Sequence, residues 1–232
     1  MLEIEKGFSM ISKYQSSPYF AHLVRVMPFV VFAVLTLFQG QFGENGAYWV
    51  YTLKTIIGAW LLWVVRAHVK EMRWNFSWEA VIAGVVVFLA WVGLDGLYPP
   101  MFGERTASFN PLKSYGDESA IAWIFIAVRI SGSSLVVPML EEVFYRSFLY
   151  RWLIKPDFFS IPLHSFSWWA FLIVCLGFGA SHYEWLPGII CAVIYQGLVI
   201  RKRRLGDAIT AHSITNFLLG LWVVLQADWQ FW

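Results

Sequence analysis

Two adjacent glutamates, Glu141 and Glu142, precede Arg146 within a stretch of sequence that is otherwise apolar. An ionised carboxylate in membrane hydrocarbon costs roughly 3 kcal/mol on insertion scales, so these residues are expected to form an interior polar site. On a helix, successive side chains point in different directions, whereas residues i and i+4 share a face. Glu142 is therefore expected to pair with Arg146 as structural support, and Glu141 to remain available as a general base. The alternative is a buried ion pair that only joins two helices.

A second candidate group is His212 and Asn216, which are four residues apart and so share one face of a helix. They fall in the early turns of an apolar segment that Asp207 could cap after Gly206. A helix N-terminus favours neutral imidazole. A neutral histidine beside an asparagine offers two hydrogen-bond donors, as an oxyanion hole requires. For this pair alone, interhelical hydrogen bonding without catalysis is an equally good interpretation.

The third candidate is His182, in a Phe-x-x-x-His pattern at the end of another apolar segment. Alone, it fits an interfacial histidine as well as a functional one. Together, the three groups predict a hydrolase site in which Glu141 and His182 orient and deprotonate a water molecule. The water would attack a peptide carbonyl, and His212 with Asn216 would stabilise the resulting oxyanion.

A zinc site is the chemical alternative, because Glu141, His182 and His212 offer one carboxylate and two imidazoles. The sequence contains no His-Glu-x-x-His motif, and Asn216 would be an uncommon zinc ligand. We therefore expect a site that needs no metal or other cofactor, with zinc as the second choice.

The composition indicates that these residues lie in a membrane. The chain has 232 residues, of which 59% are hydrophobic and 14% are charged, whereas a soluble domain has about 25% charged residues. The net charge of +2 is too small to indicate a nucleic-acid partner. No repeat or linker divides the sequence, so we expect one integral membrane domain over residues 1–232. Cys175 and Cys191 lie in apolar segments and are expected to be buried thiols.

Apolar segments of about 20 residues predict an all-α, polytopic transmembrane helical bundle with about seven to eight spans. The longest segment is interrupted near residues 131–134 and at Pro138, so it forms either one kinked helix or two helices in series. Arg129 lies deep in it, and the sequence suggests no partner for this arginine. The apolar segments cover about residues 22–38, 47–65, 79–98, 119–154, 166–183, 187–200 and 207–227, with a polar loop over 99–118.

Basic residues follow the second, fourth and sixth segments, which places them in alternate loops. The positive-inside rule then predicts a cytoplasmic N-terminus for seven spans. The first residues lack the order of a cleavable signal peptide, so the first segment is expected to be retained. Seven full spans would separate His182 from Glu141 and His212. We therefore expect the fifth segment to end inside the protein, beside a short sixth segment that begins at Pro187.

The three motifs, in this order, resemble the CPBP family, which comprises CAAX proteases and bacteriocin-processing enzymes and is also called the Abi family. Its pattern is Glu-Glu-x-x-x-Arg, then Phe-x-x-x-His, then His-x-x-x-Asn or Asp. The pattern is intact here over about residues 131–221, the expected catalytic core. One departure is Ser147 after Arg146, where many members have glycine. The matching residues are Glu141, Glu142 and Arg146, then Phe178 and His182, then His212 and Asn216.

The resemblance implies an intramembrane, glutamate-type endopeptidase without a required metal. Its substrates would be membrane-associated peptides or proteins, including prenylated CAAX-type ones. The resemblance assigns water activation to Glu141 and His182, the oxyanion hole to His212 and Asn216, and structural support to Glu142 and Arg146. Bacterial members imply a prokaryotic inner membrane location. The alternative function is a non-catalytic membrane immunity or binding protein.

Overall fold

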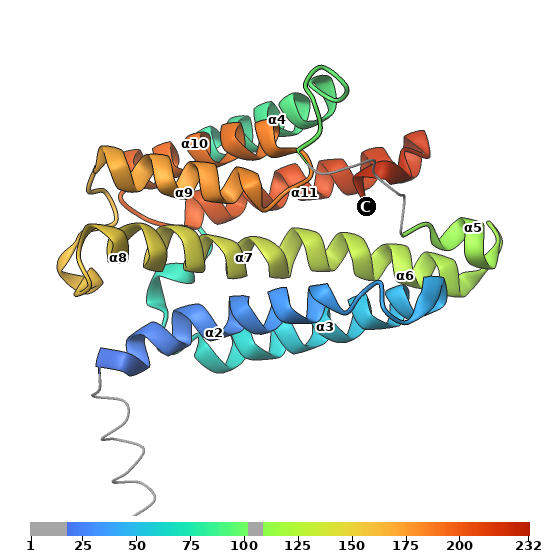
Figure 1. The fold of residues 1–232 in the computed structure, drawn as a ribbon, viewed down its shortest axis with the longest axis horizontal. Coiled ribbons are helices and arrows are strands. Elements are labelled where there is room, and N and C mark those ends of the chain that lie inside the picture. Colours follow the sequence, from blue (N-terminus) through green and yellow to red (C-terminus); the bar gives the residue numbers. More distant parts are fainter. Residues whose placement is uncertain (1–17, 102–108) are drawn as a thin grey trace, which may run out of the picture.

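The computed structural model describes residues 18–101 and 109–232, which form helices and loops without strands (Figure 1). The prediction that no signal peptide is cleaved depends on the first residues of the sequence, which lie outside these ranges. The helices that build the layers are α2 (Pro18–Leu37), α3 (Gly43–Val65), α4 (Trp78–Gly93), α6 (Ala120–Ser131), α7 (Val137–Glu142), α9 (Trp168–Ala180), α10 (Trp185–Lys202) and α11 (Gly206–Gln226). The shorter segments are η1 (Lys70–Met72), α5 (Pro111–Tyr115), η2 (Gly132–Val136), η3 (Val143–Leu149), α8 (Tyr150–Ile154), η4 (Phe158–Ser160) and η5 (Trp229–Phe231).

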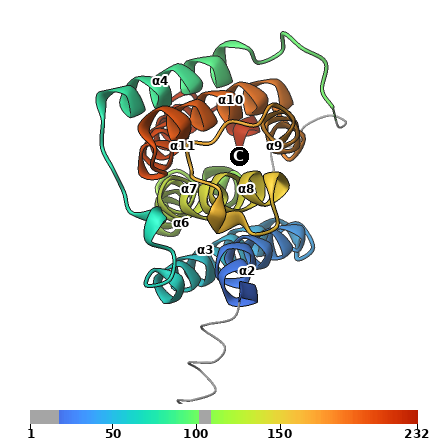
Figure 2. The ribbon, with the colours of Figure 1, turned by 90° about the vertical axis from the view of Figure 1, so that its left-hand side faces the viewer.

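The helices form layers around one long central helix, which consists of α6, η2, α7, η3 and α8 (Figure 2). Helices α2 and α3 pack on one side of it, and α9, α10 and α11 on the other. Helix α4 covers the outer face of α10 and α11. This arrangement brings the second half of the chain together around the central helix.

Within the described residues, five helices are long and apolar enough to cross a membrane, and two apolar helices, α4 and α9, are shorter. The all-α class is therefore confirmed, whereas the predicted number of seven to eight spans is not. The five long helices are Tyr19–Leu37, Asn45–Val65, Ala120–Ile154, Trp185–Lys202 and Gly206–Gln226.

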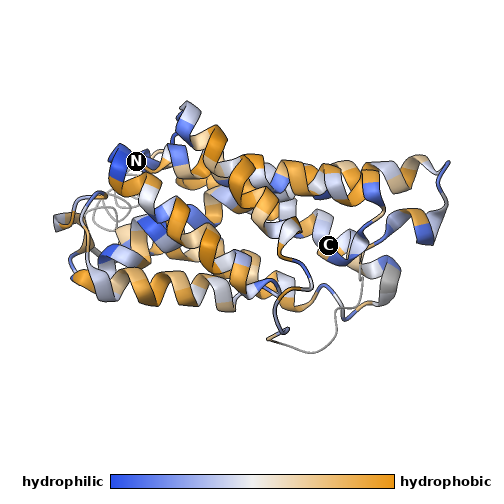
Figure 3. Cartoon of the chain, turned by 90° about the horizontal axis from the view of Figure 1, so that it is seen from above, coloured by the Kyte–Doolittle hydropathy of each residue, from blue (hydrophilic) through white to orange (hydrophobic). Residues whose placement is uncertain are grey.

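The distribution of side chains suits a lipid environment. Large apolar side chains such as Trp60, Ile82 and Leu225 are exposed on the outer faces of helices. Figure 3 shows hydrophobic residues along the helices, with hydrophilic ones mostly near helix ends and loops. Inside the bundle, Glu142 and Asp207 are completely buried. These two carboxylates thus lie in the protein interior, where partners can compensate their desolvation.

The central helix runs without interruption for 35 residues, so the predicted break near residues 131–134 does not separate two spans. The segment η2 is π-helical, and the N–H of Val137 donates to the Gly132 carbonyl, five residues back. In this register, Ser133 would need the N–H of residue 138 as its donor. Residue 138 is a proline and has none. The interruption is therefore a local change of helical register, with a carbonyl left to find another partner.

Helix α9 has 13 residues, about 20 Å of helix, which is shorter than the hydrocarbon core of about 30 Å. It ends at Ala180, and a tight turn leads directly into α10. The turn depends on Gly179, because a Cβ there would lie 2.4 Å from Ile189 Cγ1. The helix is thus shorter than the predicted segment over residues 166–183, and Ala180, Ser181 and Tyr183 around the turn are exposed. The end of this segment inside the protein stays a prediction. The sixth segment is longer than predicted, because α10 starts at Trp185 and includes Pro187 in its first turn, where proline is tolerated.

Two further predictions about helix boundaries were wrong. The third segment ends at Gly93 rather than near residue 98, before a turn at Gly96 with φ +72°. The predicted loop contains α5, which Asn110 caps by accepting a hydrogen bond from the Lys113 N–H at 3.0 Å.

Asp207 does not cap α11, contrary to the prediction. Its Oδ1 accepts from Ser77 Oγ at 2.5 Å and its Oδ2 from Arg204 Nε at 2.5 Å. Ser77 in turn caps α4 through the Ala80 N–H at 3.3 Å. Asp207 therefore joins the first turns of α4 and α11, a tertiary role that position in the sequence does not show.

A polar cluster, which we name the Glu71 cluster, joins the ends of several helices and consists of Glu71, Arg25, Ser147 and Arg151. Glu71 Oε1 accepts from Arg25 Nε of α2 at 2.7 Å and from Ser147 Oγ of η3 at 2.5 Å. Arg151 Nη2 lies 3.7 Å from the same oxygen. The cluster thus anchors α2 and the central helix to the loop before α4. Ser147, which departs from the family pattern, supplies one of these hydrogen bonds.

Candidate active site

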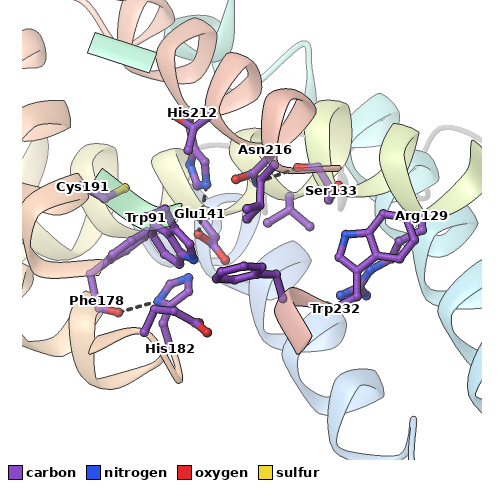
Figure 4. A pocket seen from close by; sticks show the side chains of 15 residues that line it. Trp91, Arg129, Ser133, Glu141, Phe178, His182, Cys191, His212, Asn216 and Trp232 are labelled. Atoms are coloured by element: carbon purple, nitrogen blue, oxygen red, sulfur yellow. Dashed lines mark hydrogen bonds and ion pairs between the residues drawn. The ribbon is translucent and has the colours of Figure 1, made fainter. Parts of the chain in front are cut away.

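A cavity of about 190 Å³ lies between the central helix and the helices α9 to α11 (Figure 4). Glu141 reaches it from α7, His182 from the turn after α9, and both His212 and Asn216 from α11. Parts of the sequence that are 75 residues apart are thereby brought to one enclosed volume. All four predicted catalytic residues line this cavity, whereas the chemistry assigned to them stays a prediction.

The two glutamates face different surroundings. The Glu142 side chain is fully buried, and its Oε2 lies 3.2 Å from Arg146 Nε. The Glu141 side chain is 16% exposed and turns into the cavity. The helical-phase argument predicted this division, and it holds although η3 begins directly after Glu142. Glu141 is therefore the carboxylate that can meet a bound molecule.

Arg146 is held by aromatic rings as well as by Glu142. Its guanidinium carbon lies 4.5 Å from the centre of the Phe178 ring and 6.0 Å from that of Tyr195. The side chain is buried and makes no hydrogen bond with good geometry among the residues described. Charge attraction and cation–π contacts thus hold Arg146 against Phe178, which lines the cavity.

His212 bridges both glutamates. Its Nδ1 lies 3.0 Å from Glu142 Oε1, and its Nε2 lies 3.8 Å from Glu141 Oε2. An ionised carboxylate only accepts hydrogen bonds, so Nδ1 carries the hydrogen in the pair with Glu142. A neutral His212 then presents a bare Nε2 to the cavity. The sequence argument, in which a neutral His212 donates to an oxyanion, is therefore inconsistent with this geometry; only the doubly protonated ring could donate.

Asn216 makes a structural contact that the sequence argument missed. Its Nδ2 donates to the carbonyl of Ser133 at 2.8 Å. This is the carbonyl that Pro138 leaves without a helical donor, so the amide of α11 compensates for the proline in the central helix. A primary amide has two N–H groups. The second hydrogen of Asn216 remains available to a ligand in the cavity.

The imidazole of His182 is oriented by the end of its own helix. Its Nδ1 lies 2.8 Å from the Phe178 carbonyl, which can only accept, so Nδ1 is the donor. The ring packs against Phe178 and meets Trp91 edge to face, with centroids 4.7 and 5.6 Å apart. In the neutral ring, Nε2 is then a hydrogen-bond acceptor. Figure 4 shows the ring directed toward Glu141.

Arg129 also lines the cavity, beyond Ser133 on the central helix. The partners that the sequence did not suggest are aromatic rings. The guanidinium carbon lies 4.4 Å from the centre of Tyr51, 5.1 Å from Phe109 and 5.9 Å from Trp232. These rings come from distant parts of the chain, so no local pattern could have identified them.

The chain has two cysteine thiols and several possible metal ligands. Cys175 and Cys191 are both free and buried, as predicted, and Cys191 lies in the cavity wall. Within residues 18–101 and 109–232, no three His, Cys, Asp or Glu side chains are positioned to hold a metal ion together.

Residues 119–218 match the family model described as type II CAAX prenyl endopeptidase Rce1-like. The matched range contains all three motifs and the four predicted catalytic residues that line the cavity. The resemblance drawn from the motifs is confirmed by this match. Neither the curated proteins nor the solved structures include a significant match to the chain.

Proposed function

We propose that this chain, whose residues 119–218 form a type II CAAX prenyl endopeptidase Rce1-like domain, is an intramembrane endopeptidase that activates water with a glutamate. One observation carries the proposal. Glu141, His182, His212 and Asn216, which lie on three separate elements, all line a single cavity within an apolar helical bundle. A carboxylate, a free imidazole nitrogen and an amide donor in one enclosed volume are the groups that peptide hydrolysis requires.

In the proposed reaction, Glu141 is the general base. It takes one proton from a water molecule whose other hydrogen is accepted by Nε2 of His182. The water oxygen then forms a bond to the carbonyl carbon of the substrate. The hydrogen bond from His182 Nδ1 to the Phe178 carbonyl keeps Nε2 unprotonated, so that it can orient the water.

Asn216 and His212 stabilise the oxyanion that forms. Asn216 donates the amide hydrogen that Ser133 does not use. His212 donates from Nε2 in its imidazolium form, with Nδ1 held by Glu142. Glu142 is thus a positioning residue, because it fixes the orientation of the His212 ring. Glu141 finally returns its proton to the leaving amine nitrogen as the C–N bond breaks, which regenerates the carboxylate.

We propose that the substrates are membrane-associated peptides or proteins, prenylated CAAX-type substrates among them. The apolar helices and the family match indicate an integral membrane protein. From the loops rich in basic residues we propose a cytoplasmic N-terminus, and from the bacterial members of the family that the chain resembles we propose a prokaryotic inner membrane. No cofactor is invoked, because the carboxylate and imidazoles suffice for general acid–base hydrolysis.

The decisive experiment uses purified protein in liposomes and a peptide that ends in a prenylated CAAX sequence, with products identified by mass spectrometry. Glu141→Gln keeps the shape of the side chain and removes the base, so we expect cleavage to fall by at least about 100-fold. Glu79→Gln is the matched control, because Glu79 lies at the exposed start of α4, paired with Lys202. The control is expected to cleave like the unmodified protein. Full activity of folded Glu141→Gln would refute the proposal.

Two alternatives have distinct outcomes. A non-catalytic immunity or binding protein is favoured by the structural bonds of Asn216 to Ser133 and His212 to Glu142, which join helices. It predicts no cleavage by the unmodified protein, with biological function retained in Glu141→Gln. A zinc enzyme predicts that a chelator abolishes cleavage and that added Zn²⁺ restores it.

A further inference from the structure

Among the residues that the structure describes, Arg129 is a cation in the cavity wall that has no carboxylate within 4 Å. Its Nε is buried and makes no hydrogen bond. Its close neighbours are the rings of Tyr51, Phe109 and Trp232. Aromatic faces position a guanidinium but leave its N–H donors unsatisfied.

Among the described residues, most other cations inside the protein have a carboxylate within 4 Å. Lys54 also lacks a carboxylate, but it is sealed in the protein and donates to Thr36 Oγ1 at 2.9 Å. Arg129, in contrast, faces a cavity that a ligand can enter. The described cations with a carboxylate within 4 Å are Arg25, Arg146, Arg151, Lys202 and Arg204.

Arg129 lines the same cavity as Glu141, the proposed general base, and lies on the same helix. Arg129, Ser133, Val137 and Glu141 recur at every fourth residue and all line the cavity. They form a track along one face of the central helix, about 18 Å long at about 1.5 Å per residue. An extended peptide advances about 3.3 Å per residue. The track therefore accommodates about five substrate residues.

We propose that Arg129 is the residue that binds the C-terminal carboxylate of the substrate. This inference rests on the proposed function. The guanidinium of Arg129, whose Nε makes no hydrogen bond, matches a carboxylate in geometry and charge, and such pairs are strongest where water is scarce. Arg129 would be the specificity-determining residue, with the aromatic rings holding it in place.

The first test measures binding and does not depend on cleavage. A fluorescently labelled, prenylated CAAX peptide is titrated into Glu141→Gln protein, as the free acid and as the C-terminal amide. The acid should bind about 10- to 100-fold more tightly, as a charge-assisted hydrogen bond predicts. Arg129→Gln should abolish this preference, and Arg129→Lys should retain part of it. Equal binding of acid and amide to a folded protein would overturn the proposal, whether or not the chain is a protease.

The second test measures cleavage with the same two peptides and with an amidated peptide that ends in glutamate. The acid should be cleaved about 10- to 100-fold more efficiently than either amide, mainly through KM. In Arg129→Gln, the acid and the amide should be cleaved with equal efficiency. Cleavage of the glutamate-ended amide as efficiently as the acid would overturn the assignment to the chain end.

Arg66 provides a matched control, because its guanidinium also stacks on a tryptophan, Trp63, at 4.2 Å but outside this cavity. Arg66→Gln should keep the full preference for the acid. Loss of the preference in both arginine variants would indicate a general effect of charge and refute a specific site. If no peptide is cleaved but the acid is bound in an Arg129-dependent way, the proteolytic function fails while the carboxylate site stands.

Discussion

At the scale of single residues, chemical identity does not determine role. Glu141 and Glu142 are neighbours with the same side chain, yet one lines a cavity and the other is sealed against Arg146 and His212. The difference follows from helical phase, which directs consecutive side chains to different neighbours. The buried glutamate has its charge balanced by a fixed cation. The cavity glutamate keeps an oxygen free for chemistry.

This division predicts opposite phenotypes for the same substitution. Glu142→Gln leaves Arg146 as an unpaired buried charge, so the protein should lose about 3–5 kcal/mol of stability. Glu141→Gln breaks no ion pair with arginine, so its stability should change much less while cleavage is lost. Thermal unfolding of both variants in the same detergent checks this. Equal unfolding temperatures for the two variants would contradict the assignment of Glu142 as structural support.

At the scale of the elements, the central helix depends on its neighbour. The π-helical register of η2 and the missing N–H of Pro138 leave the Ser133 carbonyl without a donor in its own helix. The amide of Asn216 on α11 supplies that donor. A register change in one helix thereby sets the position of a side chain in the cavity. The same amide is then placed to act on a substrate.

A double-mutant cycle tests this dependence. Asn216→Ala should destabilise the protein by about 1–3 kcal/mol, the cost of leaving a polar group unsatisfied. In a Pro138→Ala background the cost should be smaller, because the new N–H of residue 138 can donate to the Ser133 carbonyl. Unfolding free energies of the two single variants and the double variant give the coupling. Strict additivity would show that Pro138 is not the reason for the Asn216 contact.

At the scale of the whole molecule, the bundle is held at one end by the Glu71 cluster, in which Glu71 itself lies outside the candidate membrane-spanning helices. Burial alone would raise the pKa of Glu71. The hydrogen bond and charge of Arg25, with the hydroxyl of Ser147, outweigh burial and lower the pKa below its ordinary value of 4.5. A carboxylate with a lowered folded-state pKa stabilises the fold above the unfolded value. That contribution is lost as the pH falls through the folded value.

The pH dependence of stability should therefore change in Glu71→Gln. The variant should be less stable than the unmodified protein at pH 7, and the difference should shrink as the pH falls below about 4.5. Unfolding temperatures measured between pH 7 and pH 3 check this expectation. Glu79→Gln, which removes an exposed ion pair with Lys202, should produce a much smaller difference at pH 7. A constant difference between Glu71→Gln and the unmodified protein at all pH values would exclude the linkage.

The sequence by itself determined the helical class, the membrane setting and the candidate residues. Apolar segments of sufficient length can satisfy their backbone in a membrane only as helices or barrels. Charged residues inside such segments must be interior and partnered. Spacing of four residues then predicted the pair of Glu142 with Arg146, which the structure contains. These conclusions depend on local chemistry and helical periodicity, both of which can be read along the chain.

Only the tertiary structure decided how the candidates meet. Contacts of His212 with both glutamates, of Asn216 with Ser133, and of Arg129 with three distant rings join elements that are far apart in sequence. The turn after α9, which brings His182 to the cavity, depends on close packing against α10. Such contacts arise from the packing of whole helices, so the side chains alone do not specify them.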